Sequence, residues 1–108
     1  MRGVEELVQW LYIRLDEETA RQHDRLEQWH RRDCEPPPDA EPSALDCSCG
    51  VPRQILTEAE AKRRIVELNL RVWRHAENAQ SAAVAWTTVR LLAQPYASRL
   101  GYLEEWQA

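Results

Sequence analysis

Apolar residues recur every three or four positions along three stretches of the chain, which is the spacing of α-helices that bury one face. The first stretch covers residues 4–33, where neither glycine nor proline interrupts the pattern. Its strongest apolar stripe consists of Val4, Leu7, Val8, Leu11 and Leu15. The stripe continues more weakly to Trp29. The pattern therefore predicts one long N-terminal helix over residues 4–33.

A second helix is predicted over residues 57–78. Thr57 and Glu60 match a capping box, in which the two side chains satisfy free backbone N–H groups at a helix start. The apolar stripe that follows consists of Ile65, Leu68, Val72, Ala76 and Ala79. We expect this stripe to face the interior, with Val66 and Trp73 at its flanks.

A third helix is predicted over residues 82–94, and Pro95 ends it because proline cannot continue the hydrogen-bond ladder. The inward positions of this helix are Ala85, Val89, Leu92 and Ala93. We place a break between the second and third helices at Asn78 and Ser81, whose side chains favour helix caps. An unbroken helix over residues 57–94 is the alternative.

The C-terminal tail is aromatic, and residues 102–107 predict one last turn. This turn would pack Tyr96, Tyr102 or Trp106 back onto the helices. The length of the chain fits one domain, residues 1–108. The sequence therefore predicts an all-α domain, in which the N-terminal helix packs antiparallel on the second helix and the third helix closes a shared core.

Residues 34–54 form a proline-rich loop between the first two helices. Three consecutive prolines and the CSCG string exclude a regular helix there. A crossover of this length exceeds the usual helix–helix connection of roughly 2–8 residues. Such loops are functional, ordered by something that they bind, or mobile.

Charge and cysteine usage limit the functional classes. The net charge is −4, with seven basic and twelve acidic side chains in residues 1–54 but seven and six in residues 55–108. An acidic chain does not attract nucleic acid by default. Glu5 and Glu6 oppose a signal peptide, and no apolar run reaches the roughly 18 residues of a membrane span. Three cysteines do not form a closed disulfide set, so we expect a reducing cytoplasm.

The strongest chemical pattern is a set of potential metal ligands. It consists of His30, Cys34, Cys47 and Cys49. On a helix, His30 and Cys34 would lie one turn apart on the same face. Four thiolate and imidazole ligands suit a structural zinc ion, which would hold the proline-rich loop in place. The alternatives are free thiols in an acidic loop, or a redox role for Cys47 and Cys49.

Signals for catalysis are weak, and we expect no enzymatic activity. Asp16, Glu17 and Glu18 are consecutive, so on a helix they point about 100° apart and cannot converge on one atom. Cys34 near His30 is the exception, because an imidazole four residues away on a helix can activate a thiol. An enzyme with an unrecognised site is therefore the third functional hypothesis.

Two further surfaces are candidates for binding. The basic residues Arg63, Arg64, Arg71 and Arg74 could follow a phosphate backbone, which gives the alternative of a zinc-stabilised nucleic-acid-associated protein. Pairing with the acidic first helix is the simpler role for these residues. Trp10 and Ile13 lie outside the main stripe of the first helix. They either pack between the other helices or form a patch for a partner.

Three segments resemble a known family. They are LVQWLYIRLDEE at residues 7–18, ILTEAEAKRRIVEL at 55–68 and VRLLAQPYASRLGYLEEW at 89–106. In this order they resemble a family of small actinobacterial and actinophage proteins, a domain of unknown function. The most specific string is RLLA-x-PYA followed by Y-x-EEW. The resemblance implies a fold and a source but no site residues. It suits a protein–protein interaction module that forms a homodimer or modulates a host factor, which is our leading functional hypothesis.

Overall fold

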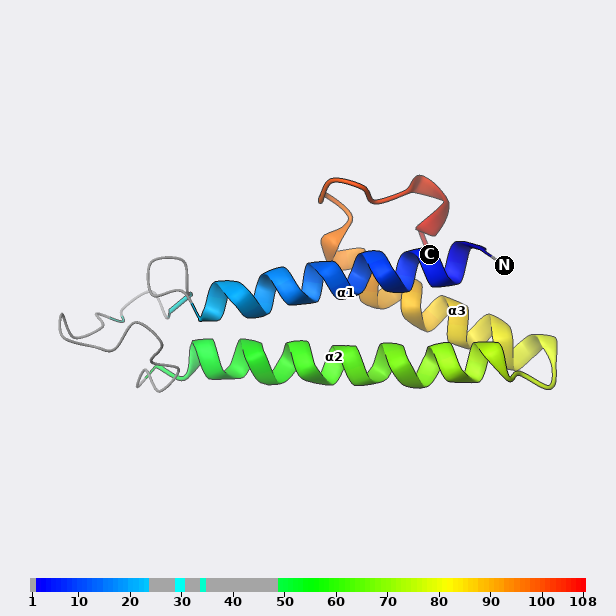
Figure 1. Ribbon diagram of the computed structural model, residues 1–108, viewed down its shortest axis with the longest axis horizontal. Helices are drawn as coiled ribbons and strands as arrows, with labels where there is room; N and C mark the ends of the chain where they lie inside the picture. The colour runs from blue at the N-terminus through cyan, green and yellow to red at the C-terminus, as the bar shows by residue number, and fades with distance from the viewer. Residues whose placement is uncertain (1, 24–28, 31–33, 35–48) are drawn as a thin grey trace. The chain divides into compact units, whose positions relative to one another are not determined.

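The computed structural model describes residues 2–23, 29–30, 34 and 49–108 (Figure 1). These residues form three α-helices and two short 3-10 turns, with no β-strand among them. The elements in chain order are α1 (Arg2–Gln22), α2 (Val51–Arg74), α3 (Ala79–Ala93), η1 (Gln94–Tyr96) and η2 (Glu104–Trp106). The predicted all-α class, with a long first helix followed by two more, is confirmed.

The chain forms two compact units. The larger unit combines Met1–Arg14 with Lys62–Ala108, and the smaller unit is Leu15–Ala61. Helices α1 and α2 each contribute a segment to both units. The prediction that residues 1–108 fold as one domain stays a prediction.

In the larger unit, α1 packs on α2 and α3. Glu5 accepts hydrogen bonds from Arg74 in a 2.9 Å ion pair, and the Arg63 guanidinium lies 4.9 Å from the centre of the Tyr12 ring. The α1 residue with the higher number, Tyr12, contacts the α2 residue with the lower number, Arg63. Helices α1 and α2 are therefore antiparallel in this unit. Gly3 faces the Trp86 ring on α3. The buried apolar side chains of this unit include Val4, Leu7, Val8, Leu11, Val66, Ala85, Val89 and Ala93.

The aromatic tail closes the larger unit, as the sequence predicts. Trp106 is 3% exposed, and its ring centre lies 5.7 Å from those of Trp10 and Tyr102. The Trp10 indole N–H donates a 3.1 Å hydrogen bond to the backbone carbonyl of Leu100. Gly101 follows with φ +91°, a left-handed conformation that glycine adopts without strain. The tail is therefore held by a hydrogen bond to α1 and by an aromatic cluster.

Gly101 is a sensitive position in this tail. A Cβ atom there would lie 2.9 Å from Trp10 Nε1, and the φ angle is unfavourable for any L side chain. We expect Gly101→Ala to lower the free energy of unfolding by about 1–3 kcal/mol, measured by chemical denaturation. Gly50→Ala is the matched control, because Gly50 has φ +74° but nothing within 4 Å of the added Cβ. An equal loss in both variants would contradict the close approach to Trp10.

Helix α1 is shorter than the sequence predicts. It ends at Gln22 instead of residue 33, and Trp29 and His30 are not helical. The buried Gln22 side chain accepts a 3.3 Å hydrogen bond from the backbone N–H of Trp29. In a continuous helix these residues would be about 10 Å apart along the axis, so Trp29 does not continue α1. The apolar stripe that supports the helix weakens beyond Leu15, which explains the early end.

Helix α2 begins earlier than predicted, and the predicted capping box is wrong. The helix starts at Val51, directly after the left-handed Gly50, and ends at Arg74 instead of residue 78. Thr57 lies inside the helix, where its hydroxyl donates a 3.0 Å hydrogen bond to the Arg53 carbonyl. Pro52 is compatible with this start because the first helical turn has no partner for its backbone N–H groups.

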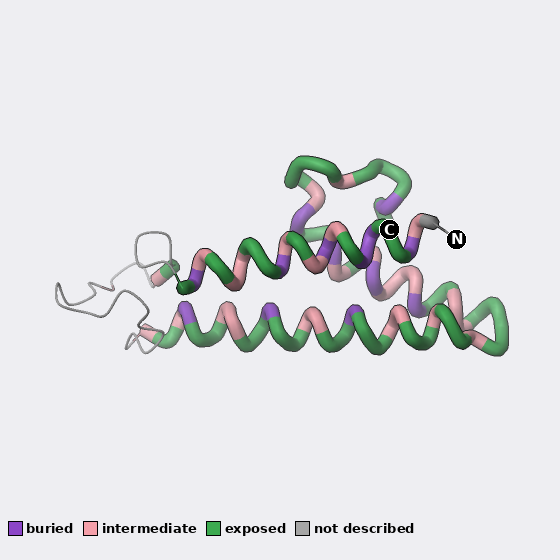
Figure 2. The backbone as a smooth tube through the Cα atoms, viewed as in Figure 1, coloured by how far each residue is buried: buried purple, intermediate pink, exposed green. Residues whose placement is uncertain are grey.

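The prediction of which face α2 buries is also wrong. Ile65, Leu68 and Val72 are 39%, 57% and 46% exposed, whereas Val66 is fully buried. Figure 2 shows buried and half-buried residues along one side of α2 and exposed residues along the other. Leu68 lies about 200° around the helix from Val66, so the two cannot share a face. Leu11 is buried and Leu92 half-buried, but Leu68 does not join them in an interior.

The reason for the different face lies in the neighbours of α2. Arg63 contacts Tyr12 on α1, and Lys62 donates a 3.2 Å hydrogen bond to the Tyr96 hydroxyl. The buried side of α2 is therefore the side between these contacts, with Val66 at its centre. The sequence did not separate the two faces because each carries apolar residues at helical spacing.

The predicted break between α2 and α3 is confirmed, and the unbroken alternative is wrong. Asn78 is the N-cap of α3, and its side-chain oxygen accepts a 2.8 Å hydrogen bond from the Ser81 backbone N–H. Such a cap satisfies one of the backbone donors that a helix start leaves without a partner. Helix α3 ends at Ala93, and Pro95 lies in the following turn η1.

Candidate functional site

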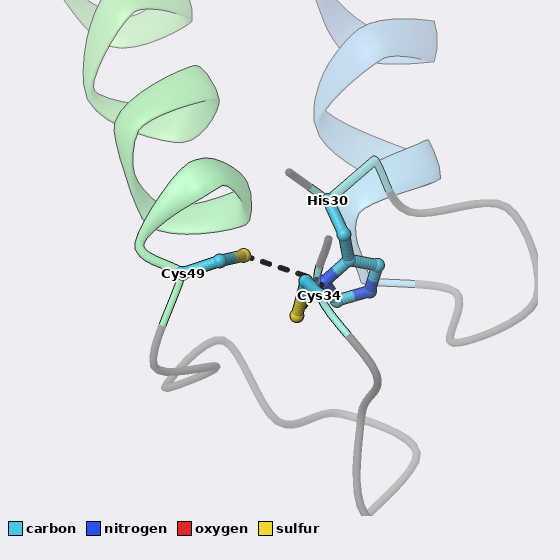
Figure 3. Close-up of side chains that lie close together, drawn as sticks. All are labelled: His30, Cys34 and Cys49. Atoms are coloured by element: carbon cyan, nitrogen blue, oxygen red, sulfur yellow. Dashed lines mark hydrogen bonds between the residues drawn. The ribbon is translucent and has the colours of Figure 1, made fainter. Parts of the chain in front are cut away.

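Three potential metal ligands converge in the smaller unit. His30 and Cys34 follow α1, and Cys49 precedes Gly50 and the first turn of α2. All three residues are half-buried. Their side chains point toward one another from separate parts of the chain (Figure 3).

The distances within this cluster are short. His30 Nδ1 lies 3.7 Å from Cys34 Sγ and 3.5 Å from Cys49 Sγ. The nitrogen and both sulfurs all lie within 4.8 Å of one another. Neither cysteine forms a disulfide. The cluster therefore presents one imidazole nitrogen and two thiols to a common point.

The sequence predicts four ligands, and the structure brings three of them together. Cys47 lies outside the described residues. The predicted placement of His30 and Cys34 on one helical face is wrong, because neither residue is helical. A Cys–His contact is also the arrangement of a nucleophilic thiol and its base. Here a second sulfur approaches the same ring nitrogen, which favours a ligand set over a single nucleophile.

Comparison with known proteins gives one family match. The model of the family of unknown function DUF6221 matches residues 4–108, which is almost the whole chain. The chain belongs to this family. Neither a curated protein nor a solved structure matches it. The predicted resemblance to a domain of unknown function is confirmed, and the actinobacterial or phage origin stays a prediction.

In this DUF6221 chain, two of the four candidate nucleic-acid-binding arginines contact α1. Arg74 pairs with Glu5, and Arg63 stacks on Tyr12. Arg64 and Arg71 lie on the exposed surface of α2. These contacts agree with the simpler expectation that basic residues of α2 pair with the first helix.

The pKa of the Tyr12 phenol is raised. Burial raises the pKa of the Tyr12 phenol above 10.0, and the nearby Glu67 carboxylate raises it further. Arg63 and Arg74 act in the opposite direction. The raised pKa keeps the phenol neutral at neutral pH, as expected for a tyrosine that packs against α2.

Trp10 and Ile13, the candidate partner-binding pair, have different surroundings. Trp10 is half-buried in the aromatic cluster and is hydrogen-bonded to Leu100, while Ile13 is 50% exposed. Since α1 packs on both other helices in this unit, Trp10 has a structural role. Of this pair, Ile13 is the residue whose apolar side chain is exposed to solvent.

A more extensive apolar surface lies on the part of α2 that belongs to the larger unit. We call Ile65, Leu68 and Val72 the α2 stripe. Helix α3 exposes Val84 and Leu91 as well, at 60% and 57%. Sequence reasoning placed the α2 stripe in the core and did not single out the two α3 residues. Apolar side chains on opposite sides of one helix, such as Val66 and Leu68, are the signal that indicates such a surface.

None of the helices that the structure describes has the length and apolar character needed to cross a membrane.

Proposed function

We propose that this chain is a non-enzymatic protein-interaction module that pairs with a second copy of itself through the α2 stripe. The observation that carries the proposal is the exposure of Ile65, Leu68 and Val72, at 39%, 57% and 46%, on one line of a helix. Burying each of these side chains against a partner would contribute roughly 1.5–3 kcal/mol before the cost of association.

The order of residues in the stripe supports a helix as the occupant. Ile65, Leu68 and Val72 are separated by three and four positions, which is the spacing of the a and d positions of a heptad. In parallel coiled coils, β-branched residues at a with leucine at d favour the pairing of two helices. The same stripe in a second copy supplies this pattern, and two-fold pairing is the commonest form of assembly.

The charge around the stripe permits self-association. Residues 55–108 carry seven basic and six acidic side chains, so two copies that meet on α2 bring together little net charge. Glu60 and Glu67 precede Arg64 and Arg71 by one turn each, which favours neutralisation within α2 itself. The exposed Val84 and Leu91 of α3 add apolar surface to the same unit.

We also propose that the chain acts in a reducing cytoplasm. Cys34 and Cys49 lie close together without forming a disulfide, as expected for thiols in that compartment.

Leu68→Arg tests the proposal. We expect the wild-type chain to sediment at twice the mass of a single 12.7 kDa chain, and the variant to sediment as a monomer. Loss of a central apolar contact of about 2 kcal/mol would weaken association roughly 30-fold, and a buried charge adds to this loss. Sedimentation equilibrium over a range of concentrations measures both states.

Leu100→Arg is the matched control, because it makes the same change at a side chain that is 93% exposed and outside the stripe. This variant should dimerise like the wild type. A wild-type monomer at high concentration would contradict the proposal. So would dissociation caused by Leu100→Arg but not by Leu68→Arg.

A further inference from the structure

We infer that His30, Cys34 and Cys49 bind a zinc ion. This site lies in the smaller unit and is independent of the proposed pairing through α2. Zinc prefers thiolate sulfur and imidazole nitrogen, and the three side chains offer one nitrogen and two sulfurs.

The spacing of the ligand atoms fits a tetrahedral ion. Zn–N and Zn–S bonds of about 2.0–2.1 and 2.3 Å, at tetrahedral angles, place a nitrogen and a sulfur about 3.6 Å apart. The observed separations of His30 Nδ1 from the two sulfurs are 3.7 and 3.5 Å. Two of the three ligand–ligand distances that involve the imidazole nitrogen in a tetrahedral site are therefore already present.

Both sulfurs of the cluster approach a single ring nitrogen. Nδ1 of an imidazole either donates one hydrogen or accepts one through a single lone pair. Both Cys34 and Cys49 nevertheless place sulfur within 4 Å of this nitrogen. A cation between the three atoms, with both thiols deprotonated, takes the nitrogen and both sulfurs as ligands at once.

The position of Cys49 also favours a thiolate. Cys49 lies two residues before the first residue of α2, at the end of the helix that carries partial positive charge. His30 and Cys34 follow α1 and Cys49 precedes α2, so bound zinc would link these two parts of the chain and add its binding energy to folding. The fourth position of a tetrahedral ion falls to a ligand other than these three residues.

Cobalt(II) titration of the full chain under reducing conditions tests the site. Cobalt takes the place of zinc in tetrahedral sites and gives visible absorption together with a sulfur-to-metal charge-transfer band. We expect about one equivalent of cobalt to bind, and zinc to displace it. Native mass spectrometry should then show one zinc ion per chain.

Variants identify the ligands. His30→Ala, Cys34→Ser and Cys49→Ser should each lower the affinity for cobalt at least 10-fold and alter the spectrum. His75→Ala is the matched control, since His75 is an exposed histidine outside the cluster, and it should bind like the wild type. Circular dichroism of the metal-free proteins checks that each variant retains its helices.

Two results would overturn the inference. One is a wild-type chain that develops no tetrahedral cobalt spectrum while its thiols are reduced. The other is a spectrum and affinity that remain unchanged in well-folded His30→Ala and Cys34→Ser.

Discussion

Replacing Trp106 by alanine is expected to lower the free energy of unfolding by about 3–5 kcal/mol. Trp106 is 3% exposed, and its ring lies against those of Trp10 and Tyr102. Removing it would leave a large cavity and would release the tail from α1. Urea denaturation followed by far-ultraviolet circular dichroism measures the loss, because this signal does not depend on the tryptophan itself.

Trp29→Ala is the matched control for this prediction, because the Trp29 side chain is 57% exposed. Its removal should lower the free energy of unfolding far less than that of Trp106. Equal effects of the two substitutions would show that the C-terminal tail does not close the larger unit.

Leu11→Ala is expected to destabilise the chain by about 2–5 kcal/mol, since Leu11 is 1% exposed and a smaller side chain leaves a cavity. Leu68→Ala is the informative comparison, because Leu68 is 57% exposed. In dilute solution, where pairing does not contribute, Leu68→Ala should change the free energy of unfolding by about 0.5 kcal/mol or less. Chemical denaturation of both variants at low concentration makes the comparison. Similar losses would place Leu68 in the interior after all.

The sequence predicts the three helices because each has a local signal that the tertiary structure does not override. The stripe from Val4 to Leu15 belongs to α1, and the N-cap Asn78 separates α2 from α3. The aromatic tail was also predictable, since Trp106 is large, apolar and placed after the helix-ending Pro95. These features depend on neighbours in sequence and on the spacing of apolar residues.

The sequence does not predict features that depend on contacts distant along the chain. The buried face of α2 is set by Tyr12 and Tyr96, which approach the helix from other elements. Thr57 and Glu60 match a capping box, but Gly50 with its positive φ and Pro52 allow α2 to start six residues earlier. A local pattern cannot decide between two starts that are both compatible with a helix.

The candidate metal site was predicted in composition but not in geometry. His30, Cys34 and Cys49 were selected because of their ligand chemistry, and they do converge. They converge although neither His30 nor Cys34 is helical, so a shared helical face does not bring them together. Residue types indicate the chemistry, whereas the path of the chain between them determines whether they meet.

If Leu68 contacts a partner and not the core, the thermal unfolding midpoint depends on protein concentration. Association of folded chains makes the unfolding midpoint rise with protein concentration. We predict such a rise for the wild type, and for Leu68→Arg a constant midpoint equal to that of the dilute wild type. A variant midpoint well below the dilute wild-type value would show that Leu68 packs in the core. A wild-type midpoint independent of concentration would show that the chain does not pair.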